Sequence, residues 1–431
     1  MKYHSLHKKA TETNFKNAVI KGLAEDKGLY FPNDVKRLPT AFINNIKQLS
    51  NQEIAFTAIR QFVGDEIPKA ELQRIIDETL SFDFPLVAIE ENIKTLELFH
   101  GPTMAFKDIG ARFMARCLGY LNRESPREVT VLVATSGDTG GAVASGFLGV
   151  DNINVVILYP SKKVSEVQEK QLTTLGQNIK ALEVDGTFDD CQAMVKRAFL
   201  DTSITSLKQL TSANSINIAR WLPQMFYFFF AYKQLATKHK KLVFSVPSGN
   251  FGNICAGMLA KQLGLPIHHF IAANNSNNVV TRYLQTGDYN VKSSFQTISN
   301  AMDVGDPSNF IRIQKIYKND FEALKSDLYS YSFTDDETRE AILHLFKKSN
   351  YIADPHGAVG YLGAKEYLKE NRDVQCVFLE TAHPVKFLDV VEPIIGNNIP
   401  LPIQIQEVIH KTKEATFISS YTELKSFLLD K

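Results

Sequence analysis

Short apolar strands that alternate with Gly-rich turns and helical segments constrain the fold of this chain more than any other feature. The runs VTVLVAT (129–135), NVVILYP (154–160) and KLVFSVP (241–247) are rich in β-branched residues, and each precedes a turn and a helical pattern. Strands that are apolar along their whole length are typical of parallel sheets covered by helices on both faces. The sequence therefore predicts an α/β fold with parallel sheets.

The chain has 431 residues, more than one growing hydrophobic core usually holds, so we expect two or three structural units. The first ninety or so residues carry helical patterns such as PKAELQRIIDETLSF and few strand signals, and the strand-turn-helix pattern begins near Phe84. We predict a largely helical N-terminal unit (1–90), an α/β domain (91–215) and a larger α/β domain (216–431). The last of these ends in a tail with helical patterns at its ends.

Charge and cysteine usage exclude several classes of function. The formal net charge is +1 and no dense Lys/Arg run occurs, so the sequence disfavours a nucleic-acid or anionic-membrane partner. The four cysteines (117, 191, 255 and 376) are far apart and form no CxxC pair, which favours buried free thiols in a reducing compartment. The start of the chain is too polar for a signal peptide, and the most apolar run, 225–232, is far shorter than the roughly 20 residues that span a bilayer. We expect a cytoplasmic protein.

Polar segments follow several of the predicted strands or precede helices. They are 100–110, 135–141, 247–253 and 381–386. In open α/β sheets, ligands bind at the carboxyl ends of the strands. We therefore expect these four segments to converge on one site.

The segment LFHGPTMAFKDIGARFM places Lys107 at a turn that leads into a helix. Pro102 and Phe106 precede it, and Asp108 follows it. An ammonium group among apolar and turn-forming residues is costly to bury, so we predict a functional role for Lys107.

The segment SVPSGNFGNICAG lies between a strand and a helix. Gly249 and Gly252 allow backbone N–H groups to turn toward one point, and the helix N-terminus adds positive potential there, which suits a phosphate monoester. The segment lacks the GK[ST] ending of a nucleotide P-loop and the GxGxxG spacing of a dinucleotide fold. Ordinary turn chemistry is the alternative.

The segment ATSGDTGGAVASG is a second turn of this kind. Gly140 and Gly141 would allow a ligand or a neighbouring backbone to approach closely. Asp138 could either cap the following helix or face a ligand, and one loop can do both.

Two further segments carry polar candidates. FLETAHPVKF contains Thr381, His383 and Lys386 at a strand end, and a lone histidine there is typically a structural hydrogen-bonding group. TSANSINIARWLPQ leads Asn217 and Arg220 into a helix, and the arginine fork suits phosphate or carboxylate. The alternative for this segment is a polar helix start with a surface arginine.

The sequence contains no HExxH motif, no CxxC motif and no carboxylate-rich metal loop. These absences predict that the protein has no catalytic metal. No GxSxG elbow supports a serine hydrolase.

A lysine at a strand-to-helix turn together with a phosphate cradle suggests pyridoxal phosphate as cofactor. The segments HGPTMAFKDIGARFM, ATSGDTGGA, NSINIARWLPQ, VPSGNFGN and ETAHPVKF occur in this order and resemble the threonine synthase family. The segment KGLAEDKGLYFPNDV resembles the N-terminal part of the same family. The resemblance runs over nearly the whole chain.

The resemblance implies the tryptophan-synthase-β superfamily fold of type II pyridoxal phosphate enzymes, with the cofactor in the cleft between two α/β domains. It implies the conversion of O-phospho-L-homoserine and water to L-threonine and phosphate. We expect a monomer or a homodimer. Serine/threonine dehydratase, cysteine synthase and a non-catalytic relative that binds phosphorylated ligands are the alternatives.

The resemblance also implies roles for residues. Lys107 matches the catalytic lysine that forms the Schiff base, Thr381 matches the hydroxyl that faces the pyridine nitrogen, and Asp138 stands where some relatives have an asparagine near the ring 3′ oxygen. The segment implied to hold the cofactor phosphate consists of Gly249, Asn250, Phe251, Gly252 and Asn253. Our candidates for binding the carboxylate and phosphate of the substrate are Thr103, Ser136, Thr139, Asn217, Arg220 and Lys386.

Overall fold

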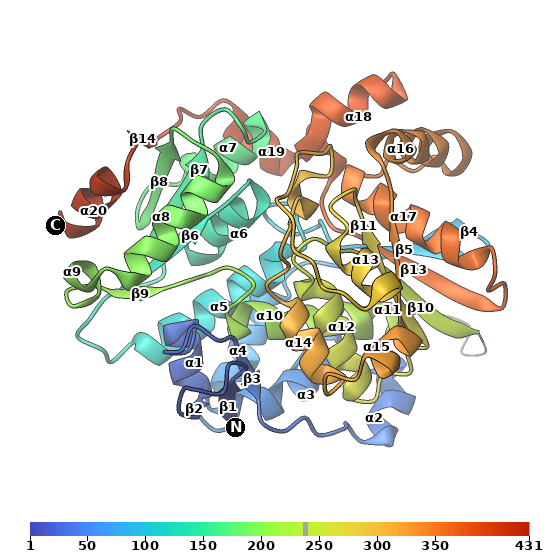
Figure 1. Cartoon of the computed structure of the whole chain (residues 1–431), viewed down its shortest axis with the longest axis horizontal. Helices are drawn as coiled ribbons and strands as arrows, with labels where there is room; N and C mark the ends of the chain where they lie inside the picture. Colours follow the sequence, from blue (N-terminus) through green and yellow to red (C-terminus); the bar gives the residue numbers. More distant parts are fainter. Residues whose placement is uncertain (236–239, 431) are drawn as a thin grey trace.

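The computed structural model describes residues 1–235 and 240–430, and their strands form three sheets (Figure 1). The six-stranded sheet has the order β12 (Leu328–Ser332), β11 (His269–Asn274), β10 (Lys241–Pro247), β13 (Val374–Glu380), β5 (Ile93–Glu97) and β4 (Leu86–Glu90). The five-stranded sheet has the order β14 (Thr416–Ile418), β8 (Ile179–Val184), β7 (Ile153–Pro160), β6 (Val129–Ala134) and β9 (Gln209–Thr211). The three-stranded sheet consists of β2 (Thr13–Asn14), β1 (Lys2–Ser5) and β3 (Tyr30–Pro32).

The two larger sheets are parallel except for the antiparallel pair β4–β5. Successive residues of one strand belong to different hydrophobic cores, because their side chains point to opposite faces of the sheet. In β6, Val131 and Val133 belong to the large core that includes residues of α5 and α6, whereas Leu132 belongs to a separate cluster with residues of α8. In β13, Val377 belongs to the first core and Phe378 to a cluster under α17. Helices thus cover both faces of each sheet, and the predicted fold class is confirmed.

The helices occupy the following residues. The N-terminal unit contains α1 (Phe15–Lys21), α2 (Thr40–Asn45), η1 (Ile46–Gln48), α3 (Asn51–Val63) and α4 (Lys69–Thr79). The middle of the chain contains α5 (Lys107–Asn122), α6 (Asp138–Phe147), α7 (Glu166–Thr173), α8 (Phe188–Leu200), α9 (Thr202–Thr205), α10 (Ile218–Trp221), η2 (Leu222–Met225), α11 (Phe226–Gln234), α12 (Gly252–Gln262) and α13 (Val279–Thr286). The last part contains η3 (Asn300–Met302), α14 (Phe310–Ile316), α15 (Phe321–Asp327), α16 (Asp335–Ser349), α17 (Pro355–Leu368), η4 (Pro384–Phe387), α18 (Leu388–Ile395), α19 (Ile403–Ile409) and α20 (Tyr421–Leu429).

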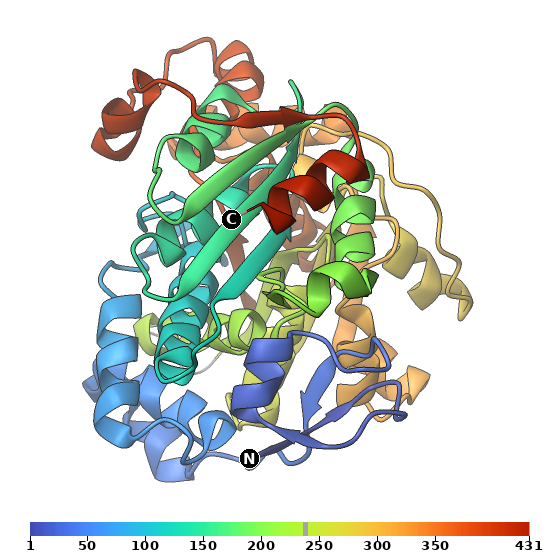
Figure 2. The same ribbon diagram turned by 90° about the vertical axis from the view of Figure 1, so that its left-hand side faces the viewer.

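Sheet membership crosses the predicted domain limits. Strand β5 lies in the segment 91–215 but pairs with β13 of the six-stranded sheet. Strand β14 lies in the segment 216–431 but pairs with β8, and Figure 2 shows it along the edge of the five-stranded sheet. Both are short strands that pair over long sequence separations, which a local pattern does not reveal. The domain limits remain a prediction.

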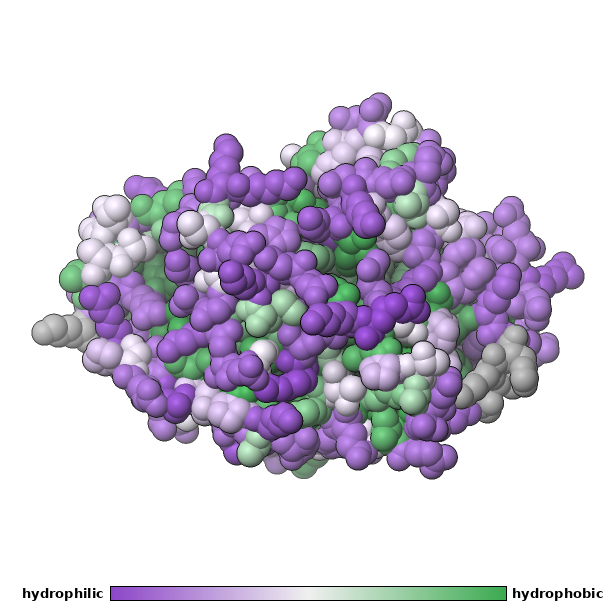
Figure 3. All heavy atoms as spheres, turned by 90° about the horizontal axis from the view of Figure 1, so that it is seen from below, coloured by the Kyte–Doolittle hydropathy of each residue, from purple (hydrophilic) through white to green (hydrophobic). Residues whose placement is uncertain are grey.

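The N-terminal unit is largely helical, as expected, but it also contains the small antiparallel sheet β2-β1-β3. Its strands have two to four residues, too short for a periodic signal. The face on which this unit lies is mostly hydrophilic with scattered apolar patches (Figure 3). No helix in the described part of the chain is long and apolar enough to cross a membrane. All four cysteines are free and buried, which confirms the prediction of buried free thiols.

A buried arginine ties the N-terminal unit to the two larger parts. Arg312 of α14 donates to the carbonyls of Tyr30 (3.1 Å), Ser215 (3.1 Å) and Ile216 (2.7 Å). Its guanidinium stacks over Trp221 at 4.4 Å and is fully buried, and burial lowers its pKa to about 10. The planar guanidinium of Arg312 therefore joins β3, the segment 215–216 and α14, which are far apart in the sequence.

We predict that Arg312→Lys lowers the free energy of unfolding by about 3 kcal/mol, because an ammonium cannot reach the three carbonyls that the guanidinium satisfies. Urea denaturation of the full chain measures this change. The matched control is Arg339→Lys, at a partly exposed arginine of α16, and it should shift the midpoint little. Equal shifts for both variants would contradict the role of Arg312.

Candidate active site

The loop before Lys107 is held against the end of β13 by backbone hydrogen bonds. The N–H of Leu98 donates to the carbonyl of Glu380 (3.0 Å), and the N–H of Phe106 donates to that of Thr381 (2.8 Å). The N–H of His383 donates to the carbonyl of Met104 (3.0 Å). These contacts fix the turn that starts α5, so Lys107 is held beside Thr381.

Lys107 is the first residue of α5, and its side chain is only 17% exposed. Its Nζ lies 3.9 Å from Oδ2 of Asp138. Burial lowers the pKa of Lys107, and this effect together with the nearby Lys386 and Arg220 outweighs the opposing effect of Asp138. The amine is therefore biased toward the neutral form, which can accept a proton.

Asp138 lies between two lysines whose segments follow strands of the six-stranded sheet. Its Oδ1 lies 2.7 Å from Nζ of Lys386 and accepts a hydrogen bond from Nε2 of Gln168 at 3.0 Å. Burial alone would raise the pKa of Asp138, but Lys386 and Lys107 hold it well below its usual range. Gly137, not Asp138, occupies the N-cap position of α6. The alternative that Asp138 caps this helix is therefore wrong.

Lys386 and Thr103 have partners within the protein. The fully buried Lys386 donates to the carbonyl of Thr103 at 2.8 Å. The hydroxyl and N–H of Thr103 donate to the buried Asp108, whose pKa is raised by burial. Gln171 also donates to the Thr103 carbonyl (3.2 Å). These contacts connect the lysine turn to α7 and η4, whereas substrate binding by Thr103 and Lys386 stays a prediction.

The predicted phosphate cradle lies between β10 and α12. Phe251 has a left-handed backbone (φ 58°) and precedes the first residue of α12. A Cβ on Gly249 would lie 2.6 Å from Cα of Met302, so only glycine fits there. The side chain of Asn250 donates to the Ser215 hydroxyl (2.9 Å) and accepts from the Ser308 N–H (2.6 Å). The loop is thus fixed on several sides.

Three of the predicted segments share one edge of the six-stranded sheet. Strands β5, β13 and β10 are parallel neighbours, so the predicted segments 100–110, 381–386 and 247–253 lie at or just after their carboxyl ends. The fourth segment, 135–141, follows β6 of the other sheet, and the pair Asp138–Lys386 connects it to them. The structure therefore brings the four segments together between the two sheets, as predicted.

The substrate candidates differ in their surroundings. Ser136 and Thr139 are partly exposed in the 135–141 segment. Asn217 is fully buried: its amide donates to the carbonyl of Val19 (2.9 Å), and its Oδ1 caps α10. The alternative of a polar helix start is thus confirmed for Asn217, while its role toward the substrate stays a prediction that these contacts do not favour.

Arg220 is 3% exposed, so the alternative of a surface arginine is wrong. It donates to the carbonyl of Ala213, and its Nε has no partner among residues 1–235 and 240–430. Burial lowers its pKa to about 10. A buried cation with an open donor is suited to an anionic group.

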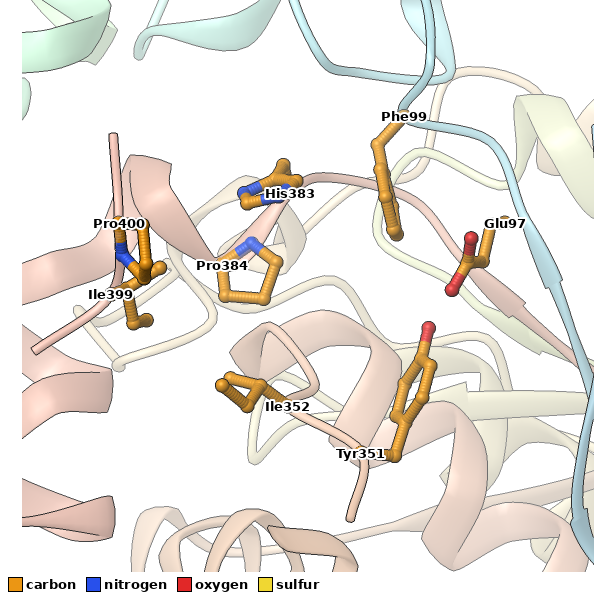
Figure 4. A pocket seen from close by; sticks show the side chains of 8 residues that line it. All are labelled: Glu97, Phe99, Tyr351, Ile352, His383, Pro384, Ile399 and Pro400. Carbon is orange, nitrogen blue, oxygen red and sulfur yellow. The ribbon is translucent and has the colours of Figure 1, made fainter. Parts of the chain in front are cut away.

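His383 acts as a structural hydrogen-bonding group, because its Nδ1 accepts from the N–H of Val385 (3.1 Å). Burial lowers its pKa to about 4. It borders a cavity of about 240 Å³ (Figure 4). The lining residues are Glu97, Phe99, Tyr351, Ile352, His383, Pro384, Ile399 and Pro400. They include no predicted cofactor or substrate residue.

Sequence reasoning missed Gln168 and Gln171. Gln168 is the third residue of α7, where it completes a capping box with Ser165. Its side chain also fills the space beside Gly137, whose φ is 138°. A glutamine at this position of a helix signals only a cap, so nothing in the sequence indicated its contact with Asp138.

The residues fit pyridoxal phosphate. Both side-chain polar atoms of Asn253 are buried without a partner among the described residues, at the start of α12. Such orphaned groups are rare unless a ligand satisfies them. The helix start and the glycine turn suit a phosphate, and the lowered pKa of Lys107 suits attack on an aldehyde carbon. No group of residues in the described ranges could hold a metal ion.

Comparisons with known proteins agree with this geometry. The model of the pyridoxal-phosphate dependent enzyme family matches residues 93–380, and the models of the threonine synthase N terminus and C-terminal part match 2–80 and 357–428. Threonine synthase of Buchnera aphidicola subsp. Baizongia pistaciae is 44% identical over 100% of both chains.

Two solved structures are similar over nearly their whole length. Threonine synthase from Escherichia coli has a TM-score of 0.93 and 40% identity, covering 100% of this chain and 99% of that one. The pyridoxal-phosphate-bound threonine synthase from Brucella melitensis has a TM-score of 0.93 and 35% identity, covering 99% and 98%. These matches favour threonine synthase over the alternatives considered from the sequence. The chain belongs to the threonine synthase family.

Proposed function

We propose that this protein converts O-phospho-L-homoserine and water to L-threonine and phosphate, the last step of threonine biosynthesis, with pyridoxal phosphate as cofactor. The family membership supports the reaction. The observation that carries the proposal is the buried amine of Lys107, with its lowered pKa, beside Asp138 and Lys386 at the shared edge of the sheet.

Several residues would hold the cofactor. In this proposal Lys107 binds it covalently, and Thr381 and Asp138 flank its ring. The residues that hold its phosphate are Gly249, Asn250, Phe251, Gly252 and Asn253. When bound, pyridoxal phosphate supplies a conjugated ring that accepts electrons from the carbon skeleton of the substrate.

Lys107 carries the protons of the reaction in this proposal. Its neutral Nζ takes a proton from Cα of the substrate and passes it to the substrate phosphate, so that the amine is neutral again. It then takes a proton from Cβ as the phosphate leaves Cγ and returns that proton to Cγ. The proton that water loses on adding at Cβ passes to Nζ, which delivers it to Cα. One flexible amine can reach three adjacent carbons, and its lowered pKa makes it release a proton more readily than an exposed lysine does.

The charges of the site suit a substrate with two anionic groups. Lys107 and Lys386 lie beside one ionised carboxylate, Asp138, and Arg220 is close enough to lower the pKa of Lys107. Burial favours the neutral form of Asp108. We propose that Arg220 and Lys386 attract the substrate anions and that the hydroxyls of Ser136 and Thr139 orient them. Thr103 and Asn217 are less suited to binding the substrate, because their side-chain polar groups already form hydrogen bonds inside the protein.

We propose a cytoplasmic location, which the four free, buried thiols support. We also propose a monomer or a homodimer. Size-exclusion chromatography with light scattering measures the mass of the native protein, and a tetramer or larger assembly would contradict the second proposal.

We predict that Lys107→Ala lowers turnover of O-phospho-L-homoserine by about 10³-fold, because no other base takes its place. Borohydride reduction in the presence of pyridoxal phosphate, followed by peptide mapping, should place the pyridoxyl group on Lys107 in the unmodified chain. The control Lys180→Ala changes an exposed lysine of β8 and should keep both properties. A label on another lysine would overturn the assignment.

We predict that Lys107 of the apoprotein becomes reactive toward an acylating reagent at a pH below 10.5, its ordinary pKa, because burial favours the neutral amine. Asp138→Asn removes a negative charge that stabilises the ammonium form, so the pKa of Lys107 should fall further. Mass spectrometry of the Lys107 peptide over a pH series measures this midpoint. An unchanged or higher midpoint in Asp138→Asn would show that the carboxylate does not act on Lys107.

A further inference from the structure

A buried histidine–carboxylate pair lies at the start of α17, outside the groups that the proposed reaction uses. Nδ1 of His356 is 2.5 Å from Oδ1 of Asp354, and the side chains are 3% and 0% exposed. Nε2 of His356 accepts a hydrogen bond from the N–H of Ala301 at 3.2 Å. Because Nε2 is an acceptor, the ring proton resides on Nδ1 and is donated to Asp354.

Ala301 belongs to η3, and η3 supports the cradle at 248–253. A Cβ on Gly249 would lie 2.6 Å from Cα of Met302 and 2.8 Å from the carbonyl oxygen of Ala301. The loop and η3 are therefore in backbone-to-backbone contact. A shift of η3 would change the space into which Gly249 fits.

The histidine pair is itself fixed from two sides. Asp354 accepts hydrogen bonds from the N–H groups of His356 (2.8 Å) and Gly357 (3.3 Å), so it caps α17. The N–H of Asp354 donates to the buried Glu380 at 2.6 Å, and Glu380 ends β13 directly before Thr381. The imidazole is thus anchored to a helix and to the central sheet.

Hydrogen bonds from Asn275 hold the two residues that flank η3. Asn275 donates to the hydroxyl of Ser299 (3.1 Å) and to Asp303 (2.9 Å), the residues next to η3. Asp303 also accepts from the N–H of Thr297 (3.0 Å). His356 binds the middle of η3 through the N–H of Ala301, the residue whose carbonyl approaches Gly249.

We infer that His356 is a positioning residue for the cofactor phosphate. It locks η3 against Gly249 and so keeps the N–H groups of the cradle in the arrangement that a phosphate monoester needs. Asp354 sets the tautomer of the imidazole, as second partners of functional histidines commonly do. The inference rests on the proposed assignment of 249–253 to the phosphate, and His356 acts through η3.

The test compares two ligands of the full-length apoprotein, pyridoxal phosphate and pyridoxal, which lacks the phosphate. His356→Asn keeps a donor near the Nδ1 position and removes the Nε2 acceptor. We expect the Kd of pyridoxal phosphate to rise about tenfold, the effect of losing a buried hydrogen bond, while the Kd of pyridoxal stays unchanged. Absorbance titration measures both constants.

His356→Gln is the matched variant, because its amide oxygen reaches the Nε2 position and accepts from Ala301. It should retain the preference for the phosphorylated ligand, and loss of that preference would overturn the inference even if His356→Asn fails to fold. Equal weakening of both ligands in His356→Asn would also overturn it, since that outcome reports general damage. Thermal unfolding of each apoprotein shows which variants are folded.

The variant Gly249→Ala distinguishes an error in the role of His356 from an error in the assignment of 249–253 to the cofactor phosphate. A methyl group there collides with η3, so the preference for pyridoxal phosphate should fall. If Gly249→Ala keeps the preference, the assignment of the cradle fails. If Gly249→Ala loses it and His356→Asn keeps it, the assignment stands and the role of His356 is rejected.

Discussion

The carboxylate of Asp138 is the electrostatic centre on which the rest of the site depends. Its segment follows β6 of the five-stranded sheet, and its two lysine partners, Lys107 and Lys386, follow strands of the six-stranded sheet. Without this carboxylate the buried Lys386 would lack a negative partner, and burying its ammonium would be costly. The one charge thus pairs with Lys386 and joins the segment 135–141 to the carboxyl ends of the six-stranded sheet. It also keeps Lys107 close to the turn from which it acts.

Hydrogen bonds around Asp138 and Lys386 fix the positions of these side chains. Gln168 holds Asp138 from α7, and Lys386 holds the carbonyl of Thr103 in the loop that precedes the reactive lysine. On the other side, the cradle at Gly249 rests on η3 and on the side-chain contacts of Asn250. Preorganised donors and charges of this kind need no rearrangement when the charge of the reacting substrate changes.

Much of this architecture could be predicted from the sequence. Apolar strands ending in polar turns indicated the parallel sheets, and the four segments predicted to converge do so. The sheets to which β5 and β14 belong could not be predicted, since a strand of three to five residues carries no information on its distant partner. The roles of Gln168 and His356 could not be predicted from the sequence for a related reason. Each has a local explanation, as a helix cap or a helix start, and its role appears only when a segment far away in the chain packs against it.

The central claim is that phosphate leaves Cγ and water adds at Cβ. Following the oxygen atoms of the reaction with an isotope label tests this claim most directly. The wild-type holoprotein is incubated with O-phospho-L-homoserine in ¹⁸O-labelled water, and both products are analysed by mass spectrometry. Because phosphate leaves with its bridging oxygen and water adds at Cβ, the account predicts threonine with one labelled oxygen and unlabelled phosphate in equal amounts. Labelled phosphate together with homoserine would show simple phosphoester hydrolysis and would contradict the account.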